Sequence, residues 1–131
     1  MAKKKTFSAL KKKLDAVFSQ YIRRKNAPRD GYAVCVTCHR VAMWKELQCG
    51  HYEPRQHLAT RWNELNCHVQ CYACNIARKG NYPRFADFLD RKYGPELRAQ
   101  LERLTKQVVK LTPADLESRI EEYQQKLEAL P

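Results

Sequence analysis

Residues 50–75 read GHYEPRQHLATRWNELNCHVQCYACN, and this stretch decides how the chain folds. It ends in the turn Cys71-Tyr72-Ala73-Cys74, and a matching turn, Cys35-Val36-Thr37-Cys38, lies upstream. A CxxC turn presents two thiolates within reach of one ion, and Zn²⁺ prefers four such ligands in a tetrahedron. The two turns therefore predict a zinc site made of Cys35, Cys38, Cys71 and Cys74.

The remaining cysteines leave an alternative open. Cys49 or Cys67 together with His39 or His68 forms a competing ligand set. In a chain with no visible secretion signal, six cysteines read as metal ligands before disulfides. Four thiolates leave no position for water, so the expected role of the zinc is to hold the fold and not to do chemistry.

Three polar residues surround the second turn and are candidates for chemistry. His51 follows a glycine at the end of an expected strand, where a neutral imidazole can take a proton from water. Asn75 directly follows a zinc ligand and offers a carbonyl oxygen, which hard cations such as Mg²⁺ prefer. Asn66 can brace the loop that carries His51. Each also has an ordinary structural explanation: a packed histidine, a turn residue or a helix cap.

Charge is concentrated near the start of the chain. The net charge is +11, and residues 1–29 carry ten Lys or Arg against one Asp. A localised basic arm favours a polyanionic partner, most simply nucleic acid, although a solvated basic terminus is the plainer explanation. The candidate DNA contacts are Lys11, Lys12, Lys13, Arg23, Arg24 and Lys25 in the arm, and Arg55, Arg61, Arg78 and Lys79 near the polar residues.

The pattern of apolar residues predicts an α+β fold with several helices. Apolar residues recur at helical spacing over 6–25, and short β structure in the form of single strands or a hairpin is expected over 41–53. A polar loop over 53–63 and a short helix from about Cys71 or Tyr72 to Lys79 should follow. Further helices are expected over 83–93, from Pro95 with an apolar side that includes Val108, and from Thr112-Pro113, which resembles a capping box.

The chain length of 131 residues suits one domain over residues 1–131. We expect a basic helical arm over 1–30, a zinc-bound core over 31–82 and a helical tail over 83–131. No apolar run is long enough for a membrane span, and no apolar stretch follows the first lysines, so we expect a cytoplasmic protein without a membrane partner.

The central motifs resemble a known family. His51, Asn66 and Asn75, with Cys71-x-x-Cys74 before the last of them, look like the HNH or ββα-metal nuclease motif in its H-N-N form. More closely, Gly50-His51-Tyr52, the run from Arg61 to Asn75, and Lys79-Gly80-Asn81 resemble the phage NinG (Rap) recombination proteins. The resemblance covers roughly residues 10–130 and is weakest in the first helix.

The resemblance implies a small zinc-stapled ββα-metal (HNH) core and a metal-dependent endonuclease for branched DNA, such as Holliday junctions or D-loops, in a phage-infected or lysogenic bacterium. His51 would be the general base, Asn75 a ligand of Mg²⁺ or Mn²⁺, and Asn66 the residue that orients the loop of His51. Paired cutting of a symmetric junction would favour a homodimer.

One position departs from many HNH sites, which have Asp or His before the base where this chain has Gly50. The second protein ligand of the catalytic ion is then open, and the nearby candidates are Glu53, His57, Glu64 and His68. Two other functions stay open as well: a zinc-stapled DNA-binding recombination accessory without catalysis, and a protein that binds a partner through helices 83–131. Trp62 and Tyr72 are expected in the core.

Overall fold

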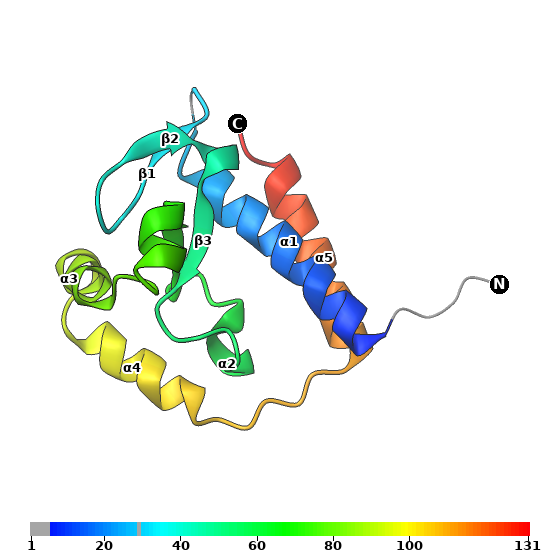
Figure 1. Cartoon of the computed structure of the whole chain (residues 1–131). Helices are drawn as coiled ribbons and strands as arrows, with labels where there is room; N and C mark the ends of the chain where they lie inside the picture. The colour runs from blue at the N-terminus through cyan, green and yellow to red at the C-terminus, as the bar shows by residue number, and fades with distance from the viewer. Residues whose placement is uncertain (1–5, 29) are drawn as a thin grey trace.

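The computed structural model describes residues 6–28 and 30–131 and has an α+β architecture, as the sequence predicts (Figure 1). Lys3, Lys4, Lys5 and Arg29, which belong to the predicted basic arm, lie outside the described residues. The elements in chain order are α1 (Phe7–Lys25), β1 (Tyr32–Val34), β2 (Val41–Met43), η1 (Trp44–Glu46), β3 (Gln48–His51), α2 (Leu58–Arg61), β4 (Cys67–Gln70), η2 (Ala73–Ala77), α3 (Tyr82–Tyr93), α4 (Glu96–Thr105) and α5 (Pro113–Glu128).

Helices α1 and α5 lie side by side and build the larger core (Figure 1). Helix α1 begins where Thr6 Oγ1 accepts a hydrogen bond from the Ala9 N–H, and its buried stripe is Leu10, Leu14, Phe18 and Ile22. Thr112 and Asp115 form the predicted capping box at the start of α5. Leu116, Ile120 and Tyr123 of α5 cover the stripe of α1, so the helical period in both segments is explained by one shared interface.

The β structure differs from the predicted hairpin over 41–53. Strand β2 pairs with β1, while β3 pairs with β4, both antiparallel. The two strands within 41–53 therefore belong to different two-stranded sheets. The Val36 N–H donates to the Val69 carbonyl at 3.0 Å and joins the two sheets. The segment before Cys35 is strand β1, and the hydrogen bond from Val36 to Val69 holds the first CxxC turn next to β4, which leads into the second turn.

Helices α3 and α4 form a smaller apolar cluster, made of Phe85, Leu89, Leu97 and Leu101. Helix α3 matches the prediction. Helix α4 ends at Thr105, so Val108 does not continue its apolar side and is 88% exposed. Residues 106–111 instead run as an extended connection toward α5 (Figure 1).

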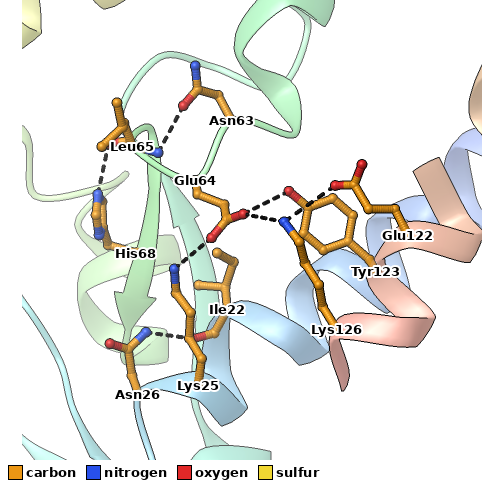
Figure 2. Close-up of polar contacts among 10 residues, drawn as sticks. All are labelled: Ile22, Lys25, Asn26, Asn63, Glu64, Leu65, His68, Glu122, Tyr123 and Lys126. Atoms are coloured by element: carbon orange, nitrogen blue, oxygen red, sulfur yellow. Dashed lines mark hydrogen bonds and ion pairs between the residues drawn. The ribbon is translucent and has the colours of Figure 1, made fainter. Parts of the chain in front are cut away.

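Glu64 ties three segments together, as Figure 2 shows. Its carboxylate accepts from Lys25 Nζ at 3.0 Å, from Lys126 Nζ at 3.1 Å and from the Tyr123 hydroxyl at 3.0 Å. Lys25 ends α1, and the other two donors lie in the last turns of α5. Burial raises the pKa of Glu64, but these hydrogen bonds outweigh it and hold the pKa below its ordinary value. The carboxylate therefore acts as a clamp between α1, α5 and the loop before β4.

Candidate functional site

The four predicted zinc ligands meet in space. The sulfur atoms of Cys35, Cys38, Cys71 and Cys74 all lie within 4.8 Å of one another. Cys35 follows β1, Cys71 follows β4 and Cys74 lies in η2, so the cluster joins both sheets to the short helix. The cluster can hold a metal ion, and four sulfur ligands fit structural zinc.

Polar neighbours lower the pKa of Cys35 and Cys74 in this cluster, whereas burial raises the pKa of Cys38. Burial opposes ionisation of Cys35, but hydrogen bonds with Thr37 and with backbone N–H groups outweigh it and lower its pKa to about 6. Asn81 Nδ2 donates to the Cys74 sulfur at 3.5 Å. Lys79, Gly80 and Asn81 all have positive φ, and this tight reversal after η2 brings the amide of Asn81 back onto the cluster.

A cavity of about 410 Å³ opens beside the cluster, and both His51 and Asn75 line it. Helix α1, strand β3 and the η2 segment contribute most of its wall. Its other lining residues are Asp15, Phe18, Ser19, Cys49, Pro54, Arg55, Ile76, Lys79, Gly80 and Tyr82. The cavity has both acidic and basic side chains on its wall, and its residues come from parts of the chain up to 67 positions apart.

One nitrogen of His51 is held by the backbone. Nε2 lies 2.8 Å from the carbonyl oxygen of Arg61, the last residue of α2. A carbonyl only accepts, so Nε2 carries the proton and the lone pair of the neutral ring is on Nδ1. Burial lowers the pKa of His51, the hydrogen bond to Arg61 opposes this, and the charge of Arg55 lowers it further. The ring is neutral at pH 7.

The predicted loop 53–63 contains α2, which the sequence analysis missed, and Asn66 holds this region in place. Asn66 is fully buried. Its Oδ1 accepts from the Glu53 N–H at 2.7 Å, and its Nδ2 donates to the carbonyls of Glu53 and Thr60, both at 3.1 Å. The amide therefore cross-links the start of the loop to α2, whose final carbonyl contacts His51.

Asn75 is positioned from two sides. Its backbone N–H donates to the Cys71 carbonyl at 2.9 Å, and its Nδ2 donates to Gln48 Oε1 at 2.8 Å. The second bond uses the donor end of the amide and turns the lone pairs of Oδ1 away from Gln48. A carbonyl oxygen held next to the cysteine cluster has the chemistry that a hard cation prefers in its ligands.

The predicted basic contacts fall into two groups. Arg55 and Lys79 line the cavity, and Lys11, Lys12, Arg55 and Arg61 line a neighbouring hollow of about 520 Å³. Lys13 lies one position further along the same helix. These residues place positive charge beside the cavity.

The second group is engaged with the protein itself. Arg23 donates to the carbonyl of Trp44 at 3.3 Å, and Arg24 also lies over the Trp44 ring. Lys25 pairs with Glu64, and Arg78 lies 4.0 Å from the Cys74 sulfur. Arg61 belongs to both groups, because it lines the hollow and also pairs with Asp15 at 2.5 Å. The structure gives each of these side chains a local partner.

Asp15 is the acidic residue of the cavity that the sequence analysis did not single out. Its carboxylate accepts from Arg61 and from the indole N–H of Trp62 at 3.0 Å. The sequence feature that could have identified Asp15 is its position, since it is the one acidic residue among the ten Lys and Arg of residues 1–29.

Trp62 is buried as predicted, whereas Tyr72 is 60% exposed and does not belong to the core.

None of the four candidates for a second ligand of the expected catalytic ion lines the cavity. The carboxylate of Glu64 accepts hydrogen bonds from Lys25, Tyr123 and Lys126. His68 donates to the Leu65 carbonyl at 2.9 Å and packs on Phe88. Glu53 and His57 are also not among the residues that line the cavity. Cys49 and Cys67, by contrast, come together with His51 and not with His39 or His68.

Within the described residues, no helix is long and apolar enough to cross a membrane. Searches of curated proteins and of solved structures returned no match. A family model described as the bacteriophage lambda NinG protein matches residues 1–131. Because this match spans the whole chain and agrees with the motifs around His51 and the cysteine cluster, the protein belongs to the NinG family of phage recombination proteins.

Proposed function

We propose that the protein is a metal-dependent, structure-selective DNA endonuclease of the HNH (ββα-metal) type that cleaves branched DNA during phage recombination. The observation that carries the proposal is the common cavity of His51 and Asn75. His51 ends β3, β4 pairs with β3, and η2 follows with Asn75. This order of two strands and a short helix, stapled by sulfur ligands, is what such a site requires.

The residues of this chain supply base catalysis and positioning. Nδ1 of His51 accepts the proton of the attacking water, because Nε2 is occupied by the Arg61 carbonyl. Asn66 fixes the loop and so the direction of the imidazole. Arg55 and Lys79 lie on the cavity wall and attract the phosphate backbone.

A hard divalent ion, Mg²⁺ or Mn²⁺, fits Oδ1 of Asn75 and would stabilise the charge on the scissile phosphate and leaving oxygen. The remaining ligands are water and the substrate, since Asp15 is the one carboxylate on the described cavity wall and is already paired with Arg61. A zinc ion held by Cys35, Cys38, Cys71 and Cys74 would have four protein ligands and would stabilise the fold without taking part in the reaction.

The test is cleavage of a labelled four-way junction in Mg²⁺ by the wild type and by His51→Ala. We expect His51→Ala to lose at least 100-fold in rate, the usual contribution of a general base, while the zinc of the four-cysteine cluster and the DNA affinity stay at wild-type levels. His39→Asn is the matched control, because His39 is exposed and its positive φ is tolerated by asparagine.

The alternative is a zinc-stapled DNA-binding accessory without catalysis, which the basic hollow beside α1 also supports. If the wild type binds branched DNA but cuts no four-way, nicked, looped or single-stranded substrate in Mg²⁺ or Mn²⁺, this alternative replaces the endonuclease. If His51→Ala cuts at the wild-type rate, His51 is not the base.

A further inference from the structure

The strand register places a second group of soft ligands on one face of the β3–β4 pair. His51 lies opposite Cys67, and Cys49 precedes His51 by two positions, so all three side chains share that face. One ligand atom from each of the three lies within 4.8 Å of the other two. This cluster is separate from Cys35, Cys38, Cys71 and Cys74, and two of its members line the cavity.

We propose that Cys49, His51 and Cys67 form a second, thiophilic metal site for ions such as Zn²⁺ or Cd²⁺, and that an ion bound there occupies the imidazole of His51. Two thiolates and one imidazole are a recognised zinc ligand set with one position left open. In a zinc tetrahedron such atoms lie about 3.5–3.8 Å apart, given Zn–S of about 2.3 Å and Zn–N of about 2.0 Å. Because the three ligand atoms lie within 4.8 Å of one another, they need to approach by at most about 1.3 Å to reach that geometry.

The burial of the three ligands fits an ion that enters from the cavity. Cys67 is 1% exposed and is not on the cavity wall, while Cys49 and His51 are half-buried and line that wall. An ion held by all three therefore has its open position toward the cavity, where water or another ligand can bind. On binding, both thiols release their protons to solvent, and two Zn–S bonds form.

The chemical consequence follows from the single lone pair of a neutral imidazole. The nitrogen that binds the ion cannot also accept a proton from water, and the other nitrogen carries its hydrogen. Occupation of this site would therefore switch off base catalysis by His51. This inhibitory consequence rests on the proposed endonuclease, whereas the binding of the ion does not.

The first experiment measures binding alone. Protein kept in a phosphine reductant is titrated with Cd²⁺, and the metal-to-protein ratio and the cadmium–thiolate absorption are recorded. We expect two ions per wild-type chain and an absorption corresponding to six thiolates. Cys49→Ser should bind its second ion at least tenfold more weakly, and Cys35→Ser should retain the site around His51 if it folds.

One ion per wild-type chain at all concentrations would overturn the proposal, as would two equally tight ions in both wild type and Cys49→Ser. Since Cys67 is buried and its replacement can disturb folding, Cys49→Ser and His51→Ala are the variants that decide the result. Circular dichroism of both variants establishes that they are folded before their metal content is compared.

The second experiment measures junction cleavage in Mg²⁺ at rising free Zn²⁺, each variant relative to its own rate without added zinc. Wild type should lose cleavage as the second ion binds, and Cys49→Ser should need at least tenfold more zinc for the same loss. Equal sensitivity of the two would overturn the inhibitory role. If the protein binds two ions but cleaves no DNA, the second metal site is retained and the proposed endonuclease is rejected. If it cleaves DNA but binds only one ion, the endonuclease is retained and the second metal site is rejected.

Discussion

The side chain of Gln70 occupies the space that a Cβ atom on Gly50 would need. A Cβ built on Gly50 would lie 1.9 Å from Gln70 Oε1, far inside contact distance. Gln70 is fully buried, and its Nε2 donates to Thr37 Oγ1 and to the Gly80 carbonyl. Position 50 can therefore carry no side chain while Gln70 bridges the first CxxC turn and the chain reversal after η2, which explains why the residue before His51 is not a metal ligand.

Gly50→Ala should destabilise the fold by about 2 kcal/mol or more, because the methyl group meets a buried side chain that cannot move away. Urea denaturation measures the loss. The double variant Gly50→Ala/Gln70→Ala removes the obstacle, so its destabilisation should be smaller than the sum of the two single changes. Strictly additive values would show that the contact between the two residues does not limit position 50.

Asp15→Asn should cost about 2–4 kcal/mol of stability, because it leaves the largely buried guanidinium of Arg61 without its counter-charge. Asp90→Asn is the matched control. Asp90 also pairs with an arginine through two hydrogen bonds, to Arg98, but that pair is more exposed, so its loss should destabilise the protein clearly less than Asp15→Asn does. Equal losses in urea denaturation would contradict the ranking by burial.

Removal of zinc by a chelator under reducing conditions should unfold the region around both CxxC turns, because binding of the ion by four thiolates is coupled to the folding of the segments that carry them. We expect near-ultraviolet circular dichroism to be lost and to return on addition of Zn²⁺ but not of Mg²⁺. Retention of the full signal in metal-free protein would mean that the cysteine cluster is not the staple of the fold.

Glu64→Gln should destabilise the protein by about 1–2 kcal/mol at pH 7, because two ammonium groups lose their partner. The folded-state pKa of Glu64 lies below its ordinary 4.5, so its contribution is complete above that pH and disappears as pH falls below it. The difference in unfolding free energy between wild type and Glu64→Gln should shrink between pH 6 and pH 3.5. If this difference in unfolding free energy grew as the pH fell, the pKa of Glu64 would be raised by folding and not lowered.

Replacement of Lys11 and Lys12 by serine should weaken DNA binding and lower the slope of log affinity against log salt by up to about 2, if both contact phosphate. The two lysines line the hollow beside the cavity. Lys106→Ser/Lys110→Ser removes the same charge from the exposed connection before α5 and is the control. Filter binding at several salt concentrations gives the slopes, and equal slopes in the two double variants would argue against a phosphate contact by α1.

The cysteine cluster could be predicted because metal ligands need a fixed spacing that is visible in the chain. Strand pairing could not, since the partners of Val41–Met43 and Gln48–His51 are chosen by tertiary packing and not by their own residues. Asp15 was missed for a similar reason. Only folding brings its helix beside Arg61 and Trp62, which lie more than 40 positions later.

The pairing of α1 with α5 has a consequence for how the protein is made. A ribosome completes α1 at Lys25 and begins α5 at Pro113, so 87 residues separate the two halves of the larger core. At roughly 5–20 residues per second, α1 waits on the order of ten seconds with Leu10, Leu14, Phe18 and Ile22 uncovered. The nascent chain therefore cannot complete its larger core until α5 has emerged, and a translation product interrupted before Pro113 leaves the apolar stripe of α1 without its covering helix.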